Sequence, residues 1–186
     1  MNGFQHSLSR RGFITLGLIT ALSSAIPFEA CGAVRKMITP ERSLSFYSTH
    51  TGEKLRSIYW CQGRYVPGAL ADINRILRDH RTGDIKKIDT KLLDLLYVLH
   101  GEFGTREPFH IISGYRSPKT NSILRKRSRG VAKNSMHTCG KAVDIRLPGR
   151  KLENLLTAAV ELKKGGVGYY PESEFIHVDV GRVRYW

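Results

Sequence analysis

Two segments in the C-terminal half of the chain carry side chains able to bind a metal ion. One contains His137 and Asp144, and the other contains His177 followed by Asp179. A zinc hydrolase needs three ligands of imidazole or carboxylate type and leaves a fourth position open for water. The metal lowers the pKa of that water from about 15.7 towards about 7, and a nearby carboxylate carries the proton to the leaving amine. His137, Asp144 and His177 are therefore candidate zinc ligands.

Spacing alone leaves a structural interpretation open. A His and an Asp seven residues apart often occur by chance, and a lone histidine in a strand is more often a hydrogen-bonded core residue than a ligand. The segment 175–180 is predicted to be a strand, where residues two apart project from one face. Asp179 would then lie beside His177. A third polar segment, SGYRSP at 113–118, lies upstream and contains Arg116.

The order of these segments resembles a known family. Residues 135–144 (SMHTCGKAVD) are similar to the Ser-x-His-x-x-Gly-x-Ala-x-Asp signature of the zinc D-Ala-D-Ala carboxypeptidase superfamily. Within it, the chain resembles the murein endopeptidases exported by the twin-arginine route. Further similar stretches lie at 112–117, 127–133, 165–171 and 181–186. The resemblance runs from about Leu44 to the end and includes an export signal.

The resemblance implies a role for each site residue. His137, Asp144 and His177 would bind Zn²⁺. Arg116 would bind a substrate carboxylate or polarise its carbonyl; the alternative is an Arg that caps or salt-bridges the following helix. The general base would be Asp179, as in the endopeptidases, or Glu174, as in the carboxypeptidases, and we favour Asp179 because strand geometry fixes it beside His177. Ser135 and Tyr115 would orient ligands or substrate, or be structural. Cys139 occupies a position where the signature has no ligand.

The implied reaction is hydrolysis of an amide bond in cross-linked peptidoglycan, between meso-diaminopimelate and either D-Ala or a second diaminopimelate. One alternative is a D,D- or L,D-carboxypeptidase that trims stem peptides. Another is a non-catalytic module that binds the cell wall and keeps zinc for structure. A fourth ligand from Asp179 or Cys139 would favour that module, because closed zinc sites exclude water.

The pattern of the whole chain predicts an α+β domain. A β-hairpin or small meander is expected over 43–66, followed by helices over 68–81 and from an N-cap at Asp89. Strands are expected at 109–113, 141–146 and 175–180, with helices over 118–127 and 152–163, and Gly165-Gly166 separating the final strands. We expect a largely antiparallel sheet with helices on one side, the hedgehog/D-Ala-D-Ala carboxypeptidase-type fold that the resemblance implies.

The N-terminus predicts export. Arg10-Arg11 precedes an apolar run of about eleven residues, shorter than the roughly twenty that span a bilayer. We expect a signal over 1–33, a linker over 34–41 and the zinc peptidase domain over 42–186, with the twin-arginine translocase as partner and the periplasm as location. A buried helix that begins Arg-Arg is the alternative. Phe28-Glu29 fits a lipoprotein site at Cys31 poorly, so no lipid anchor is expected.

Charge is consistent with an envelope protein. The 30 Lys and Arg residues against 16 Asp and Glu give a net charge of +14, which suits a polyanion such as nucleic acid, an anionic membrane or a cell-wall polymer. The chain lacks the interleaved basic and aromatic residues of a nucleic-acid platform, and the export signal argues against a cytoplasmic nucleic-acid binder. The basic run 125–129 is either a solvated face or an approach for anionic substrate. Whether Cys61 and Cys139 pair is left open, and we expect a monomer.

Overall fold

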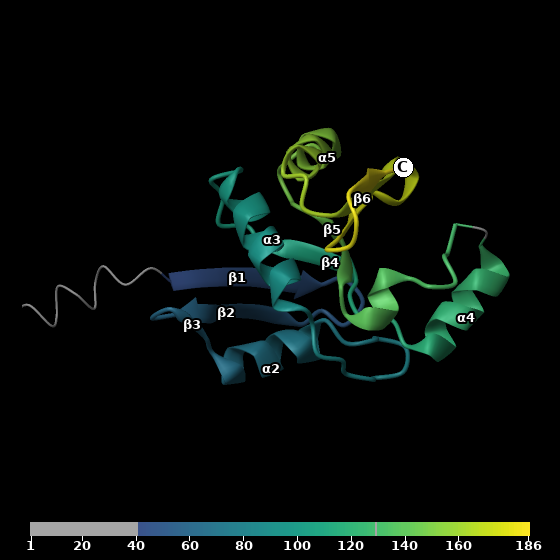
Figure 1. Cartoon of the computed structure of the whole chain (residues 1–186), viewed down its shortest axis with the longest axis horizontal. Helices are drawn as coiled ribbons and strands as arrows, with labels where there is room; N and C mark the ends of the chain where they lie inside the picture. Colours follow the sequence, from purple (N-terminus) through teal and green to yellow (C-terminus); the bar gives the residue numbers. More distant parts are fainter. Residues whose placement is uncertain (1–40, 129) are drawn as a thin grey trace, which may run out of the picture. The chain divides into compact units, whose positions relative to one another are not determined.

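The computed structural model describes residues 41–128 and 130–186 (Figure 1). Their strands are β1 (Glu41–Ser48), β2 (Lys54–Cys61), β3 (Arg64–Tyr65), β4 (Phe109–Ser113), β5 (Ala142–Arg146), β6 (Gly166–Tyr170), β7 (Phe175–Asp179) and β8 (Arg184–Tyr185). The helices are α2 (Pro67–Ile76), α3 (Thr90–Gly101), α4 (Pro118–Arg127) and α5 (Leu152–Glu161), with 3-10 turns η1 (Met136–Cys139) and η2 (Pro171–Ser173). No helix in these ranges has the length and apolar character needed to span a membrane. The predicted export signal lies outside the described residues.

The eight strands form one sheet in the order β3-β2-β1-β4-β5-β7-β6-β8. Neighbours are antiparallel except at β1/β4 and β6/β8, so the predicted α+β fold with a largely antiparallel sheet is confirmed. In the β5/β7 pair, Asp144 lies opposite His177 and Ala142 lies opposite Asp179. Directly opposed residues share one face of a sheet, so this register places the candidate ligands side by side.

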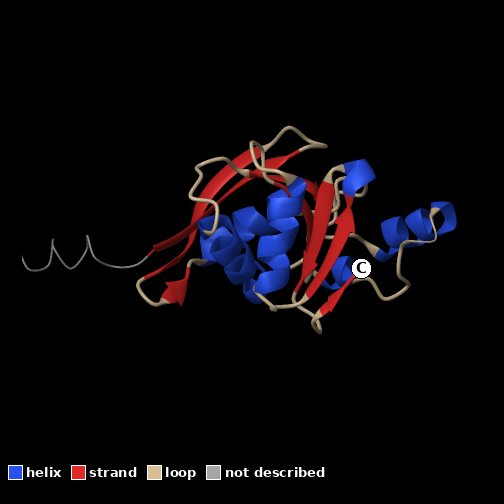
Figure 2. Ribbon diagram, turned by 90° about the horizontal axis from the view of Figure 1, so that it is seen from above, coloured by secondary structure: helices blue, strands red, loops and turns tan. Residues whose placement is uncertain are grey.

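The two faces of β5 and β7 differ in what they contact. Val143, Ile145, Ile176 and Val178 are buried in one apolar cluster with residues of α2, α3 and α5. Burying each such large apolar side chain favours the folded state by about 1.5–3 kcal/mol. Successive side chains alternate along a strand, so the ligand-bearing residues project from the opposite face. Figure 2 shows the sheet curving around the helices of this core, while α4 lies apart from them.

Several predicted boundaries were wrong. The helix predicted over 68–81 ends at Ile76, and Asp79 then accepts hydrogen bonds from the N–H groups of Arg81 and Ser117 that hold the chain in a turn. The helix predicted over 152–163 ends at Glu161. Strands β6 and β8 were not predicted; β6 reads GVGYY, and its two glycines weaken the strand pattern. Its hydrogen bonds to β7 and β8 stabilise it as a strand although its local sequence does not favour one. The first strand begins at Glu41, inside the predicted linker.

Candidate metal centre and cleft

Three elements bring the predicted metal ligands together: η1 carries His137, β5 carries Asp144 and β7 carries His177. Their ligand atoms form a triangle. His137 Nε2 is 3.2 Å from Asp144 Oδ1 and 3.1 Å from His177 Nδ1, and the last two atoms are 2.9 Å apart. Ligand atoms at about 2.0–2.1 Å from tetrahedral zinc lie about 3.3 Å from one another. The triangle therefore has the size of one face of a zinc coordination tetrahedron.

The ring of His137 is oriented by the segment that follows β4. Its Nδ1 donates a hydrogen bond of 2.7 Å to the carbonyl of Gly114, which leaves Nε2 facing the triangle. Gly114 packs directly against the backbone of Leu77, and a side chain there would collide with the Leu77 carbonyl. The N–H of Tyr115 donates to that same carbonyl. Sequence reasoning missed this role of Gly114; its position next to Tyr115-Arg116 was the available signal.

The ring of His177 is oriented by Asp179. His177 Nε2 donates to Asp179 Oδ2 at 3.0 Å, so Nδ1 faces the triangle. Asp179 is completely buried and also accepts hydrogen bonds from Arg184 and from the N–H groups of Gly166 and Gly181. Burial alone would raise the pKa of Asp179, but these hydrogen bonds, led by that of His177, outweigh it and lower the pKa. Asp179 lies beside His177, on the ring edge away from the triangle.

The carboxylate of Asp144 is the anionic member of the triangle. Burial would raise its pKa, but the charge and hydrogen bonds of His137 and His177 outweigh burial and lower it. Arg116 donates to Asp144 Oδ2 at 3.4 Å and to Ser113 Oγ at 3.3 Å. The Arg116 Nε is buried and has no hydrogen-bond partner among the described residues. Arg116 also lines the cleft beside the triangle.

The triangle opens into a cleft of about 490 Å³. One wall comes from the chain after α4, and the other is aromatic. The rings of Tyr170 and Phe175 stack with centroids 4.7 Å apart. Trp186 donates from Nε1 to the Tyr170 hydroxyl, and its ring centroid is 5.3 Å from that of His177. This wall is built from residues on β6 and β7 and from the residue after β8, and it was not predicted from the sequence.

The remaining predicted residues occupy three different environments. Ser135 is buried and lines the cleft. Tyr115 packs against the apolar core and does not line the cleft. Glu174 is exposed, has a left-handed backbone (φ 51°) and pairs with Arg146 at 3.0 Å, outside the cleft lining. Cys139 is exposed and, like Cys61, is a free thiol.

Comparison with known proteins gives a consistent result. A family model described as Peptidoglycan L,D-endopeptidase MepK matches residues 36–186. Proteins with this name from Escherichia coli and Shigella flexneri are 43% identical over 179 residues, covering 96% of this chain and 97% of each relative. A probable peptidoglycan L,D-endopeptidase MepK from Haemophilus influenzae is 39% identical over 180 residues, covering 96% and 95%. No solved structure matches the chain significantly.

Proposed function

Since the chain belongs to the peptidoglycan L,D-endopeptidase MepK family, we propose that it is a zinc-dependent murein endopeptidase of the cell envelope. The substrate is cross-linked peptidoglycan, and the reaction is hydrolysis of a peptide cross-link during cell-wall growth and remodelling. The zinc ligands are His137, Asp144 and His177.

The observation that carries this proposal is a group of three ligands at the floor of an open cleft. Structural zinc sites are closed by four protein ligands, whereas catalytic sites keep one position free. Within the described ranges the group contains His137, Asp144 and His177 and no fourth member. Asp179 is held by Arg184 behind His177, and Cys139 lies outside the group. These contacts favour a catalytic site over a structural zinc module.

The surrounding residues fit amide hydrolysis. A zinc ion at the triangle would polarise the scissile carbonyl and lower the pKa of a bound water to about 7. Arg116 lines the cleft, where its guanidinium charge would stabilise negative charge developing on the carbonyl oxygen. Gly114 and Asp179 hold the two imidazole rings in the tautomers that metal binding needs. Ser135 lines the cleft where it can contact substrate.

Amide hydrolysis also needs a general base, and the two candidates for it are Asp179 and Glu174. The contacts of Asp179 support a positioning role, because its oxygens are occupied by donors and one of them holds the ring of His177. Glu174 would have to leave Arg146 and turn towards the cleft. A direct proton shuttle by either acid stays a prediction.

The names of the relatives favour one cross-link. An L,D bond joins the L-centre carboxyl of one meso-diaminopimelate to the D-centre amine of a second, whereas a D-Ala–diaminopimelate bond is D,D. We therefore propose the diaminopimelate–diaminopimelate link as substrate. Stem-peptide trimming by a carboxypeptidase is the enzymatic alternative, since Arg116 could bind a terminal carboxylate.

Purified muropeptides test this function. Protein lacking residues 1–33 is incubated with dimers joined by either cross-link and with monomers, and products are separated by chromatography. We expect diaminopimelate-linked dimers to become monomers, chelator to stop the reaction and added zinc to restore it. Monomers that lose a terminal residue while dimers persist would identify a carboxypeptidase. Binding to sacculi without turnover of any substrate would identify the non-catalytic module.

We further propose that the protein reaches the periplasm through the twin-arginine translocase and acts there as a monomer without a lipid anchor. Arg10-Arg11 and the short apolar run support the route. Action on peptidoglycan requires a location outside the cytoplasm.

A further inference from the structure

One stretch of the chain carries strong positive charge that the catalytic site does not use. Between Glu107 and Asp144 the sequence contains eight Lys or Arg residues and no Asp or Glu. Five of them form what we call the α4 basic surface, comprising Lys119, Arg125, Lys126, Arg127 and Lys133. All five are exposed, and none forms an ion pair with a described residue. Their charge is therefore uncompensated.

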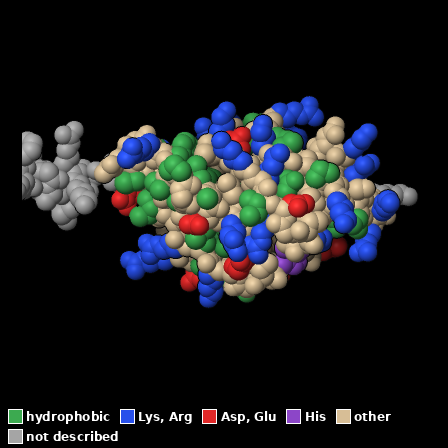
Figure 3. Space-filling model, turned by 90° about the horizontal axis from the view of Figure 1, so that it is seen from below, with side chains coloured by type: hydrophobic (Ala, Val, Ile, Leu, Met, Phe, Trp, Pro, Cys, Tyr) green, Lys and Arg blue, Asp and Glu red, His purple; other side chains and the backbone are tan. Residues whose placement is uncertain are grey.

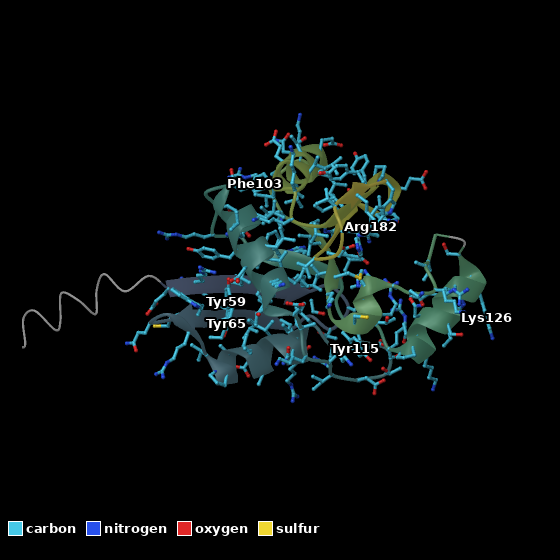
Figure 4. All side chains as sticks on the ribbon, in the orientation of Figure 1. Tyr59, Tyr65, Phe103, Tyr115, Lys126 and Arg182 are labelled. Carbon is cyan, nitrogen blue, oxygen red and sulfur yellow. The ribbon has the colours of Figure 1, made fainter. Side chains whose placement is uncertain are left out.

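The helix that carries most of this surface contributes little to the core. Only Thr120 and Asn121 are buried on α4, and both are polar. Figures 1 and 2 show α4 to one side of the sheet, with its outer side uncovered by the other described elements. Figure 3 shows several Lys and Arg side chains at that end, besides others elsewhere on the same face, and Lys126, labelled in Figure 4, lies on α4.

The α4 basic surface is continuous with the catalytic cleft. The side-chain amide of Asn121 donates to the carbonyls of Ala132 at 3.2 Å and Lys133 at 3.3 Å, which ties the following segment back onto α4. Residues of that segment, including Val131 and Ala132, form one wall of the cleft. Ser128, the C-cap of α4, and Asn134, next to Lys133, also line the cleft, so the cleft wall adjoins the α4 basic surface.

We propose that the α4 basic surface binds free carboxylates of the stem peptides that flank the cross-link held in the cleft. This inference rests on the proposed function. The cleft binds the scissile bond, and the α4 basic surface binds the neighbouring part of the polymer. Stem peptides carry carboxylates on D-glutamate and diaminopimelate, and these repeat along the wall. Single exposed ion pairs are weak, but several on one polymer raise the effective concentration of cross-links at the cleft.

The test compares two triple variants with the same loss of charge. Arg125→Gln/Lys126→Gln/Arg127→Gln alters the α4 basic surface. Arg56→Gln/Arg64→Gln/Arg75→Gln alters exposed residues on β2, β3 and α2, near the opposite edge of the sheet from the ligand strands. Both are assayed at low ionic strength for co-sedimentation with intact sacculi and for turnover of a soluble muropeptide dimer, with zinc content and thermal unfolding as controls. Wild-type protein is also tested on sacculi whose carboxylates have been amidated, and wild-type protein and both variants are tested on phosphatidylglycerol vesicles.

We expect the α4 variant to bind sacculi about tenfold more weakly, the size of three ordinary exposed ion pairs. Its turnover of the soluble dimer and its zinc content should stay at the wild-type level, as should sacculus binding by the control variant. Amidated sacculi should bind wild-type protein as weakly as native sacculi bind the α4 variant. Equal losses in both variants, no effect of amidation, or a loss confined to vesicle binding would overturn the proposal. Failure of wild-type protein to cleave the dimer would instead count against the proposed function, because sacculus binding is measured independently.

Discussion

At the scale of single residues, the two imidazole rings of the site differ in what fixes them. A neutral backbone carbonyl, that of Gly114, orients His137, while the buried carboxylate of Asp179 orients His177. Asp179 is in turn held by Arg184 and by two backbone N–H groups. Partners of this kind tune ligand orientation and basicity, and their loss typically costs about 10–100-fold in metal affinity or activity.

Replacing any one ligand should abolish both zinc retention and cross-link cleavage. His137→Ala, Asp144→Ala and His177→Ala each remove one of three donors from a site whose affinity depends on all of them. The matched control is Cys139→Ala, which lies between two ligands in sequence but outside the triangle. Zinc content by elemental analysis and dimer turnover are measured on each protein. Full zinc occupancy in an alanine variant would remove that residue from the ligand set.

Asp179→Asn and Glu174→Gln separate positioning from proton transfer. If Asp179 positions His177, Asp179→Asn should weaken zinc affinity about 10–100-fold, with turnover recovering at saturating zinc. Glu174→Gln should change both quantities little, because Glu174 is exposed and lies outside the cleft lining. Zinc titration and single-turnover rates on one dimer give the two readouts. A rate loss of about 10²–10⁴-fold in Asp179→Asn with unchanged zinc affinity would identify Asp179 as the shuttle. The same loss of rate in Glu174→Gln would identify Glu174 as the proton shuttle.

At the scale of elements, the loop that carries Arg116 depends on the turn after α2. Asp79 is buried and accepts from the N–H of Ser117 at 2.9 Å, at the start of α4. Burial alone would raise the pKa of Asp79, but hydrogen bonds from Thr120, Ser117 and the Arg81 N–H outweigh it and lower the pKa. The ionised carboxylate therefore links α2, the Arg116 loop and α4.

Asp79→Asn should lower the free energy of unfolding by about 2 kcal/mol near neutral pH, the value of hydrogen bonds to a charged group. The folded-state pKa of Asp79 is depressed, so its contribution is fully present above the unfolded pKa of about 3.9 and is lost as pH falls towards the folded value. The difference in free energy of unfolding between wild type and Asp79→Asn should therefore become smaller below about pH 4. Urea unfolding between neutral pH and pH values below 4 measures this difference. The control is Asp72→Asn, which changes an exposed acid on α2. A gap that is constant with pH would contradict the assignment.

Strand β6 makes room for the aromatic wall. Gly168 lies opposite His177, and a Cβ there would be 2.6 Å from the ring of Trp186. Gly168→Ala should displace Trp186, destabilise the fold by about 1–3 kcal/mol and raise KM for the dimer while zinc is retained. Tryptophan fluorescence, denaturant unfolding and steady-state kinetics check this. Gly68→Ala, at a position with open space, is the control; equal effects in both would show that the wall does not depend on Gly168.

At the scale of the whole molecule, the predicted route to the periplasm rests on residues outside the described ranges. Replacing Arg10 and Arg11 with Lys should leave an uncleaved precursor in the cytoplasm, because the arginine pair is the address that the translocase reads. Fractionation and immunoblotting of precursor and mature forms measure this in the host. A matched control changes Arg35 and Lys36, which lie beyond the predicted signal, to Gln. Normal processing of the arginine-pair variant in a host without the twin-arginine translocase would contradict the proposed route.

The sequence by itself determined the features that depend on neighbouring residues. The helix predicted over 118–127 has those bounds, and Asp89 caps α3 by accepting from the N–H of Lys91. Caps and helical periodicity involve contacts within a few residues, so the local pattern is sufficient. Residue types suggested the three candidate ligands that the structure brings together, and the resemblance to the carboxypeptidase superfamily implied them.

The tertiary structure alone decided which atoms face one another. His137 and His177 are 40 residues apart, and their approach depends on the β5/β7 register and on the Gly114 carbonyl. Strand spacing placed Asp179 next to His177, but only packing against Arg184 turned its oxygens away from the triangle. Glycine-rich β6 became a strand because β7 and β8 supply its hydrogen bonds. Contacts between distant segments depend on register and packing, and local sequence patterns do not encode either one.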